Sequence, residues 1–339
     1  MNKNPRICIA LDYWEKDTFL PQVQEDKLRK ISDDLHFIEP RNLQGESEWI
    51  GWLKEKKPEI LITAWQTATL PENCLEEVPE LKYVCHFAGS VKKTVPTSLL
   101  EKGLLLTNWG NSISRTIAET ALMLGIGALR RASHWTMEMH QKGGWKDRLT
   151  VVTGSLFERK VGLHGFGVIS RELVKLLQPF NVTISTFSPS VPDSLLEEFG
   201  VSRAPDLESL FSENDVIVEL AALTPKNTGI VTEKLLRSIP AGGAFVNVGR
   251  GAVVDEEALA RVAEEGHIQV ALDVYGKEPL PLDSPFRGMT NVFLLPHLGG
   301  PTIDRRQDAA AHGIENIQRY LAGEELESQV TVEITKRIT

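Results

Sequence analysis

The chain has 339 residues, of which 42% are hydrophobic and 24% are charged, and its formal net charge is −9. This length is enough for two packed domains and too long for one core. The acidic balance argues against nucleic acid or an anionic membrane as the main partner, because surfaces that bind phosphate-rich partners carry excess Lys and Arg. No apolar stretch has the length of a membrane span or of a signal-peptide core, so we expect a cytoplasmic protein without membrane contact.

Cysteine and histidine patterns give no sign of a metal site. The three cysteines, Cys8, Cys74 and Cys85, lie in or near apolar runs without CxxC spacing, and the eight histidines include no HExxH pair. We therefore expect buried, reduced thiols and no bound metal.

In the first third of the chain, short β-branched runs alternate with amphipathic segments. The runs predict strands at residues 6–11, 59–63, 82–88 and 104–108, and the segments between them predict helices that include residues 20–31 and 47–56. Such alternation is typical of βαβ units and a parallel sheet. It predicts a first doubly wound domain.

A long helical pattern follows at residues 114–141. In its first half, apolar residues nearly surround the helix. A helix that is apolar on all sides must be buried on more than one of them, so we expect it between domains or against another subunit.

A second alternating series follows the glycine-containing segment 142–147 and predicts a second doubly wound domain. Its strands are expected at residues 161–164, 182–187, 215–220, 243–248, 268–273 and 292–295, and its helices include residues 168–178 and 255–265. The chain then predicts a helix over residues 304–326 that ends at Gly323, and a β-like tail at residues 329–334.

The segment "GLHGFGVIS" has the features of a dinucleotide-binding turn. An apolar strand precedes Gly165, and apolar residues at helical spacing follow Gly167, so the turn lies at the N-terminus of a helix that favours a pyrophosphate. Ser170 stands where a third glycine is usual, and it is only slightly larger. The pattern predicts a dinucleotide site.

The choice of dinucleotide is open from the sequence. An acid about 20 residues after such a turn normally binds the ribose 2′-hydroxyl and repels a 2′-phosphate. Here the equivalent position is Ser188, which removes the main obstacle to NADP, yet the adjoining "PSV" supplies no cation. Both NAD and NADP remain candidates.

Ionisable residues follow three later predicted strands. Arg250 lies between two glycines, Asp273 and Glu278 follow the next strand, and His297 follows the last one. Because the carboxyl ends of parallel strands meet at one edge of a sheet, these side chains are expected near the glycine turn. An arginine, a histidine and a carboxylate that orients the histidine are a suitable set for reducing a carbonyl group.

With these residues in place, the chain resembles the D-isomer-specific 2-hydroxyacid dehydrogenases. The matching segments are "HFAGSV", "TNWGNSISRTIAE", "GLHGFGVIS", "VNVGRGAVVDEEAL", "ALDVYGKEP" and "PHLGGPT", in the family's order and spacing. The resemblance implies hydride transfer between a nicotinamide cofactor and a small D-2-hydroxy acid or 2-keto acid. An alternative is a dinucleotide-sensing, corepressor-like binding protein on the same fold.

The resemblance also implies roles for individual residues. Arg250 would bind the substrate carboxylate and carbonyl, His297 would be the acid/base, and Glu278 would pair with His297. The backbone of Ala88, Gly89 and Ser90 would hold the substrate carboxylate. Cofactor contacts are implied at Gly165, Gly167, Val168, Ile169, Ser188, Thr224, Gly249 and Asp273.

For chain organisation, the resemblance implies an inserted cofactor domain. A flavodoxin-like substrate domain would comprise residues 1–108 and 300–339, and a Rossmann dinucleotide-binding domain residues 109–299. It further implies a homodimer through residues 114–141.

Overall fold

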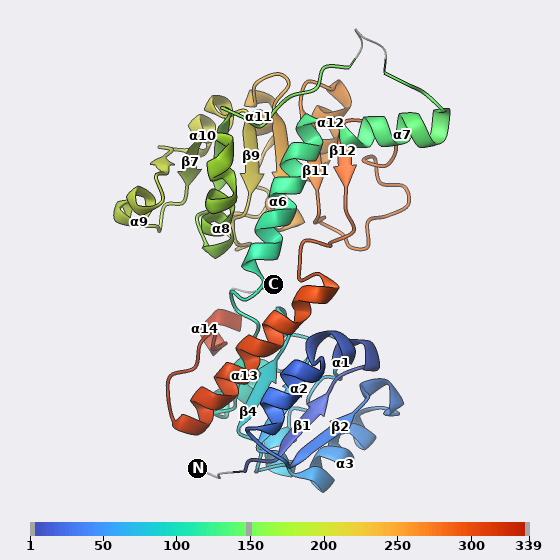
Figure 1. The fold of residues 1–339 in the computed structure, drawn as a ribbon, viewed down its shortest axis with the longest axis vertical. Helices are drawn as coiled ribbons and strands as arrows, with labels where there is room; N and C mark the ends of the chain where they lie inside the picture. The colour runs from blue at the N-terminus through green and yellow to red at the C-terminus, as the bar shows by residue number, and fades with distance from the viewer. Residues whose placement is uncertain (1–3, 147–150, 336–339) are drawn as a thin grey trace. The chain divides into compact units, whose positions relative to one another are not determined.

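The computed structural model describes residues 4–146 and 151–335. The chain divides into two compact units: unit 1 comprises Met1–Ile113 and Pro301–Thr339, and unit 2 comprises Ser114–Gly300. The chain passes between units at 113/114 and 300/301, where the sequence placed the domain junctions at 108/109 and 299/300. Each unit is built on its own parallel sheet (Figure 1).

Unit 1 contains a five-stranded parallel sheet in the order β2-β1-β3-β4-β5. This is the flavodoxin-like order, as predicted. Its strands are β1 (Ile7–Ala10), β2 (Leu35–Ile38), β3 (Ile60–Thr63), β4 (Tyr83–His86) and β5 (Leu105–Thr107). Its α-helices are α1 (Tyr13–Phe19), α2 (Gln22–Arg29), α3 (Glu46–Lys56), α4 (Cys74–Glu77), α5 (Thr97–Glu101), α13 (Arg306–Ala322) and α14 (Val332–Thr335), with 3-10 turns η1 (Pro40–Asn42) and η4 (Ile303–Arg305).

The central strands of unit 1 are buried on both faces. Every residue of β1, β3 and β4 is buried, and α13 packs beside α1 and α2 (Figure 1). Cys8 and Ala10 of β1 belong to a core cluster with Trp49 of α3, while the alternate residues of the same strand are buried as well. Such continuous apolar runs are the pattern of strands covered by helices on both sides.

Unit 2 contains a seven-stranded parallel sheet in the order β12-β11-β10-β9-β6-β7-β8. Its strands are β6 (Lys160–His164), β7 (Thr183–Phe187), β8 (Ser202–Arg203), β9 (Val216–Glu219), β10 (Ala244–Asn247), β11 (Gln269–Leu272) and β12 (Val292–Leu294). Counted from β6, this is the Rossmann order 3-2-1-4-5-6 with one strand added. The predicted fold class, two doubly wound parallel-sheet domains, is confirmed.

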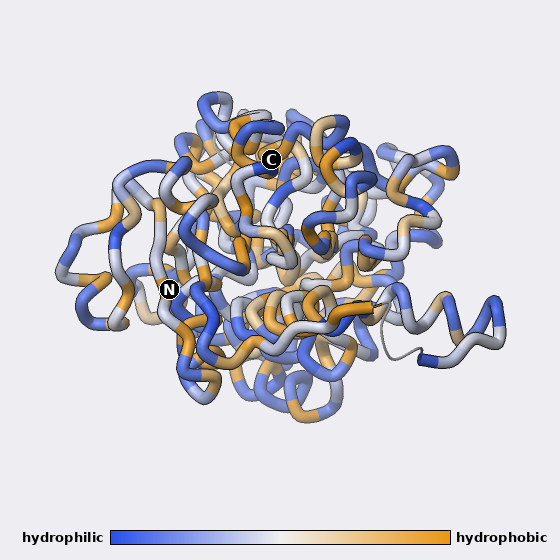
Figure 2. Tube along the Cα trace, turned by 90° about the horizontal axis from the view of Figure 1, so that it is seen from above, coloured by the Kyte–Doolittle hydropathy of each residue, from blue (hydrophilic) through white to orange (hydrophobic). Residues whose placement is uncertain are grey.

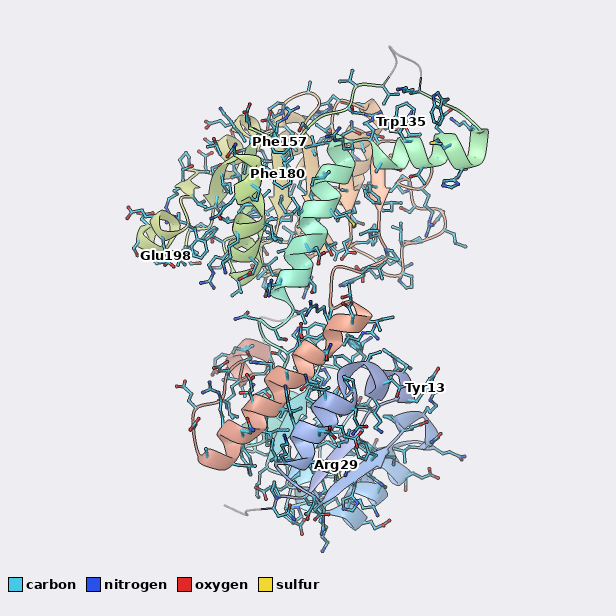
Figure 3. All side chains as sticks on the ribbon, in the orientation of Figure 1. Tyr13, Arg29, Trp135, Phe157, Phe180 and Glu198 are labelled. Atoms are coloured by element: carbon cyan, nitrogen blue, oxygen red, sulfur yellow. The ribbon has the colours of Figure 1, made fainter. Side chains whose placement is uncertain are left out.

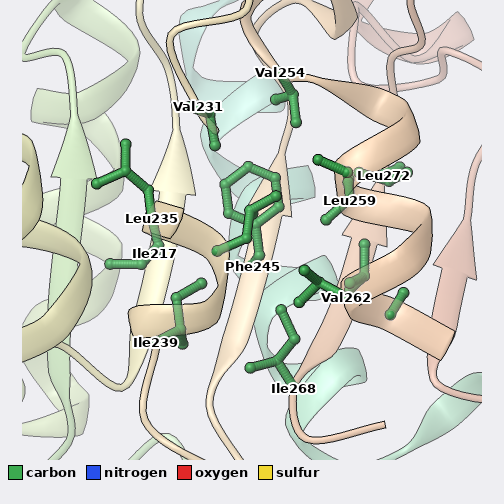
Figure 4. Packing of buried hydrophobic residues seen from close by; sticks show 14 of the residues in the cluster. Ile217, Val231, Leu235, Ile239, Phe245, Val254, Leu259, Val262, Ile268 and Leu272 are labelled. Atoms are coloured by element: carbon green, nitrogen blue, oxygen red, sulfur yellow. The ribbon is translucent and has the colours of Figure 1, made fainter. Parts of the chain in front are cut away.

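The helices of unit 2 cover its sheet. They are α6 (Ser114–Leu129), α7 (Ala132–Lys142), α8 (Val168–Leu177), α9 (Asp193–Glu198), α10 (Leu207–Glu213), α11 (Glu233–Ser238) and α12 (Glu256–Glu265), with 3-10 turns η2 (Gln178–Phe180) and η3 (Gly251–Val253). α6 packs against α8 and across β10 and β11. On the other face, Phe245 of β10 lies among aliphatic side chains such as Leu235 and Leu259, as Figure 4 shows. Along the described part of the trace, hydrophobic and hydrophilic stretches are interspersed (Figure 2).

The predicted helix over residues 114–141 is two helices. Arg131 adopts a left-handed conformation with φ 59°, which ends α6 and turns the chain into α7. α6 contributes buried residues such as Ala118 and Leu124 to the core of unit 2. α7 has no buried residue, and its Trp135 is labelled in Figure 3. The apolar circumference of the first half is therefore partly accounted for within unit 2.

Three other segments differ from expectation. The tail at residues 329–334 is not a strand: Gln329 makes an isolated antiparallel bridge to Thr107, and the chain then turns into α14. β2 and β8 carry no fully buried residue and were not predicted. Both missed strands lie at sheet edges, where the apolar signal is weakest because one side of the strand is open.

Within residues 4–146 and 151–335, no helix has the length and hydropathy needed to cross a membrane, and no three His, Cys, Asp or Glu side chains gather where a metal ion could bind. Cys8, Cys74 and Cys85 are buried and unpaired.

Candidate active site

The glycine turn between β6 and α8 leaves backbone accessible at a helix N-terminus. Gly165 has φ 92°, and a Cβ there would lie 3.0 Å from backbone atoms of Ala221, so both conformation and space favour glycine. Gly167 is the N-cap of α8 and receives no side-chain cap, and a Cβ at Gly167 would meet nothing within 4 Å. A phosphate can therefore approach the first N–H groups of α8, which belong to Val168 and Ile169.

Ser170 is fully buried in the position of the usual third glycine. Its Oγ donates a hydrogen bond of 2.8 Å to the carbonyl oxygen of Gly165, which lies in the same turn. The serine thus fits the close packing of α8 on β6 because its hydroxyl has a partner. It also ties the helix to the turn that a plain glycine would leave unlinked.

A buried histidine–carboxyl pair adjoins this turn. His164 and Glu219 are register partners on β6 and β9, and His164 Nδ1 lies 2.5 Å from Glu219 Oε2. The other carboxylate oxygen accepts from the N–H of Ala221 at 2.8 Å. The pair was not predicted, because its members lie 55 residues apart in sequence and only strand pairing brings them together.

Ser188 follows β7, and its backbone is held from the neighbouring strand. Arg203 of β8 donates to the carbonyl oxygen of Ser188 at 3.1 Å. Sequence reasoning noted that no cation follows Ser188 and missed this one, which comes from the next strand.

Arg250 follows β10 in a turn that requires glycine on both sides. A Cβ at Gly249 would lie 3.1 Å from the carbonyl oxygen of Glu219, and one at Gly251 would lie 1.9 Å from the backbone of Tyr275. Asn247 accepts from the N–H of Gly249 at 3.0 Å and donates to the carbonyl oxygen of Arg250 at 3.2 Å. The turn therefore holds the backbone while the Arg250 side chain is exposed.

Glu278 and His297 form a direct pair. His297 Nδ1 lies 2.7 Å from Glu278 Oε2, and Glu278 Oε1 accepts from the N–H of Tyr275 at 3.0 Å. A carboxylate accepts, so Nδ1 is the donor and Nε2 is left to exchange a proton with a ligand. The His297 side chain is 51% exposed, which leaves it accessible.

Asp273 fixes the turn that carries His297. Its two carboxylate oxygens accept from the N–H groups of Leu298 at 2.6 Å and Gly299 at 2.8 Å, and its carbonyl oxygen accepts from the N–H of His297 at 2.9 Å. Burial raises the pKa of Asp273. His297 itself has φ 55°, a left-handed conformation that is uncommon outside glycine and that this set of hydrogen bonds maintains.

The three ionisable groups follow neighbouring strands. Arg250, Glu278 and His297 come after β10, β11 and β12, which are adjacent in the sheet. Adjacent strands lie about 4.8 Å apart, so β10 and β12 lie about 10 Å apart, within reach of two long side chains that contact one small molecule. Two further predicted positions are loop residues: Thr224, after β9, is held by Asn227 at 2.6 Å, and Gly249 precedes Arg250.

In unit 1, the loop Ala88, Gly89 and Ser90 follows β4. All three carbonyl oxygens are engaged, by the N–H of Trp109 at 3.3 Å, by Asn108 at 2.9 Å and by the ring of His86 at 3.1 Å. Within the described chain, none of the loop's three N–H groups donates to the protein. Unused N–H groups in a fixed loop can bind an anion.

The same edge of the unit 1 sheet carries an aromatic cluster that the sequence did not indicate. Trp14 stacks on Trp65 with ring centroids 5.9 Å apart, Trp65 meets Trp109 edge to face at 5.8 Å, and the Arg306 guanidinium lies 5.1 and 5.2 Å from the rings of Trp14 and Trp65. α13 brings Arg306 here from the far end of the sequence, so no local pattern indicates this contact.

Comparison with protein families decides the identity. The model of the "D-isomer specific 2-hydroxyacid dehydrogenase, NAD binding domain" matches residues 122–299, more than half of the chain. The chain belongs to the D-isomer specific 2-hydroxyacid dehydrogenase family. The predicted family and the prediction of an enzyme are confirmed, and unit 2 contains the family's NAD-binding domain.

Relatives within this family include two kinds of enzyme. The chain is 30% identical over 270 residues to a glyoxylate/hydroxypyruvate reductase B of Pectobacterium atrosepticum, covering 77% of this chain and 82% of the relative. It is 29% identical over 280 residues to a D-3-phosphoglycerate dehydrogenase of Methanocaldococcus jannaschii, covering 82% of this chain but 53% of that protein. A solved structure, a putative D-isomer specific 2-hydroxyacid dehydrogenase from Polaromonas sp. JS6 66, matches 97% of this chain and 100% of its own with a TM-score of 0.78 at 22% identity, which supports the fold.

Proposed function

We propose that this dehydrogenase transfers hydride between a nicotinamide cofactor and a small D-2-hydroxy acid or 2-keto acid. The observation that carries the proposal is the His297–Glu278 pair, whose turn is held by Asp273. Arg250 lies at the same sheet edge, after β10, two strands away from β12, which precedes His297. A proton-transferring group and a guanidinium at one sheet edge suit the reduction of a carbonyl beside a carboxylate.

His297 is the proposed acid/base. Because Nδ1 is bound to the Glu278 carboxylate, Nε2 can donate a proton to a keto oxygen during reduction and accept one from a hydroxyl during oxidation. The hydrogen bond to Glu278 fixes the orientation and the tautomer of the ring. Asp273 acts on the same ring indirectly, since it holds the turn on which His297 lies.

Arg250 is the proposed ligand of the substrate carboxylate and carbonyl oxygen. A guanidinium offers several donors in one plane, and it stabilises the negative charge that develops on the oxygen as the carbonyl is reduced. The free N–H groups of Ala88, Gly89 and Ser90 are a second proposed carboxylate ligand. Local donors of this kind let an acidic protein bind an acid.

The residues of unit 2 fit a nicotinamide dinucleotide. The open backbone at Gly167 and the uncapped N-terminus of α8 suit the pyrophosphate, and Val168, Ile169, Ser188, Thr224, Gly249 and Asp273 are the other proposed contacts. When bound, the nicotinamide supplies or accepts the hydride. Ser188 in place of an acid makes both NAD and NADP candidates.

The assembly and location are also proposals. Residues 114–141 are the proposed homodimer contact, supported by the exposed side chains of α7 and by Met123 of α6, which is 45% exposed. We expect the protein in the cytoplasm.

A spectrophotometric screen tests the activity. Purified protein is mixed with NADH or NADPH and a panel of 2-keto acids that includes glyoxylate, hydroxypyruvate and larger homologues, and absorbance at the reduced-nicotinamide band is followed. We expect turnover with at least one member of the panel. Absence of turnover with every acid and both cofactors, in a protein that binds a dinucleotide, would overturn the proposal.

A further inference from the structure

One arginine, Arg203, forms hydrogen bonds with several residues of the segment that follows β7. The Arg203 guanidinium donates to the carbonyl oxygen of Ser188 at 3.1 Å and to that of Val191 at 2.6 Å, and its Nε donates to the Asp193 carboxylate at 2.6 Å. Arg203 ends β8, which pairs in parallel with β7. The cation therefore has a fixed place beside Ser188, although 15 residues separate the two in sequence.

The same guanidinium retains a donor for a ligand. An arginine side chain has five N–H groups. Nε and Nη2 contact the Asp193 carboxylate, Nη2 also donates to Val191, and one Nη1 N–H donates to Ser188, which leaves the second Nη1 N–H. The Arg203 side chain is 33% exposed. It lines a pocket of about 410 Å³ together with Phe187, Pro189 and Val191. This volume is typical of small-molecule sites.

The position of this pocket matches the adenosine end of a dinucleotide. In a Rossmann sheet the pyrophosphate lies at the first helix N-terminus, and the residue at the end of the second strand contacts the adenosine ribose. Here that residue is Ser188, whose hydroxyl does not repel a phosphate. Arg203 supplies, from the third strand, the cation that a 2′-phosphate requires and that residues 189–191 lack.

From this geometry we propose that Arg203 binds the 2′-phosphate of NADP(H) and that the enzyme prefers NADP(H) to NAD(H). The inference rests on the proposed function, since it assumes that unit 2 binds a nicotinamide dinucleotide. It adds the identity of that dinucleotide and the residue that selects it.

Asp193 opposes this assignment, because its carboxylate pairs with Arg203 at 2.6 Å. The Asp193 side chain is 74% exposed, so water screens the pair and the carboxylate can rotate away from an incoming phosphate. A phosphate monoester carries close to two negative charges at neutral pH and competes well with one exposed carboxylate. Asp193 therefore lowers the affinity for NADP(H) without preventing binding.

Equilibrium binding tests the inference without turnover. The dissociation constants of NADPH and NADH are measured by nucleotide fluorescence and calorimetry for the wild type, Arg203→Gln and Asp193→Asn, with Arg261→Gln as the matched control. Arg261 is an exposed arginine of α12 paired with Glu233, away from the β7 loop. The affinity ratio of the two nucleotides is the readout, because it cancels any general loss of folding.

We expect the wild type to bind NADPH at least about tenfold more tightly than NADH, which corresponds to about 1.4 kcal/mol. Arg203→Gln should remove most of this ratio by weakening NADPH, Asp193→Asn should increase it, and Arg261→Gln should leave it unchanged. The ratio should also fall as salt is raised, because it depends on an accessible charge pair.

Two failures are distinguishable. If neither nucleotide binds to the folded wild type, the proposed function is overturned and this inference with it. If both bind but NADH binds as tightly as NADPH, or if Arg203→Gln weakens both equally, the inference alone is overturned. In that last case Arg203 only anchors the β7 loop.

Discussion

The carboxyl edges of the two parallel sheets carry different kinds of side chain. In unit 2 the edge carries exposed ionisable groups, Arg250 and the Glu278–His297 pair, each after a buried strand. In unit 1 the corresponding edge carries stacked indole rings and the guanidinium of Arg306, which lies over two of them. The first set can move a proton and bind an anion, whereas the second mainly shapes a surface.

The two edges also hold their loops differently. In unit 2 the loop after β12 is held by the carboxylate of Asp273, which follows β11 and accepts from two N–H groups of that loop. In unit 1 the loop after β4 is held through its carbonyl oxygens, one of which contacts His86. Holding a loop by its carbonyl oxygens leaves its N–H groups available for the carboxylate that we propose it binds.

The largest effect is expected at the Glu278–His297 pair, which has no counterpart among the aromatic residues at the edge of unit 1. His297→Asn should lower kcat by about a thousandfold, because general acid–base catalysis contributes about 10² to 10⁴. Glu278→Gln should lower kcat less, since the imidazole remains and loses only the carboxylate that orients it. The measurement is the steady-state rate with the best substrate of the screen. Retention of wild-type kcat in His297→Asn would remove His297 from the mechanism.

The next effect concerns His86, which contacts the carbonyl oxygen of Ser90 in the loop after β4 of unit 1. Burial lowers its pKa from 6.5 to about 4, and its Nδ1 meets the hydroxyl of Thr63 at 2.8 Å. Between these two pKa values the unfolded chain binds a proton that the folded chain does not. The free energy of unfolding should therefore fall as the pH drops from 6.5 toward 4, by up to about 3 kcal/mol from this one group.

Urea unfolding at pH 7 and pH 4.5 measures this loss, with tryptophan fluorescence as the probe. Most of the tryptophans belong to unit 1, namely Trp14, Trp49, Trp52, Trp65 and Trp109. His86→Gln should lose less stability on acidification than the wild type, whereas His140→Gln, on the exposed surface of α7, should keep the wild-type difference. Equal pH dependence in wild type and His86→Gln would show that folding does not lower the pKa of this imidazole.

Sequence patterns predicted the central strands of both sheets better than the edge strands and the helix boundaries. Buried parallel strands are continuous apolar runs, so the central strands of both sheets were found, while β2, with no fully buried residue, was not. The division of residues 114–141 into α6 and α7 depends on a single left-handed residue, Arg131, which is not a residue type that marks helix ends.

For the site, residues that follow a strand directly were predicted, and residues that reach it from another element were not. Arg250, Glu278 and His297 belong to local motifs. Arg203 reaches Ser188 from a two-residue strand, and Arg306 reaches Trp65 from α13. Local sequence carries no signal for such contacts, because the pairing of distant elements creates them.

Trp65 tests whether the aromatic edge of unit 1 selects the substrate. Trp65→Ala removes contacts with Trp14, Trp109 and Arg306, and should change the ratio of kcat/KM between small and bulky 2-keto acids by about tenfold, as expected for a change of pocket size. The matched control is Trp52→Ala, which removes an indole from the stacked Trp49–Trp52 pair of α3. A selectivity change of the same size in both variants would point to general loosening of unit 1 and against a selective edge.

Ser170 gives the smallest expected effect and probes the glycine turn of unit 2, which we propose contacts the dinucleotide through its backbone. Ser170→Ala removes the bond to the carbonyl oxygen of Gly165 and leaves that oxygen without its side-chain donor, which should cost about 1 kcal/mol of stability. Ser170→Gly restores the usual residue of the turn but adds the cost of glycine within a helix, about 1 kcal/mol relative to alanine. Thermal unfolding with and without dinucleotide should therefore rank wild type above Ser170→Ala, and Ser170→Ala above Ser170→Gly. If Ser170→Gly instead proves the most stable of the three, the hydroxyl strains the turn, and the serine is present for a reason other than linking α8 to Gly165.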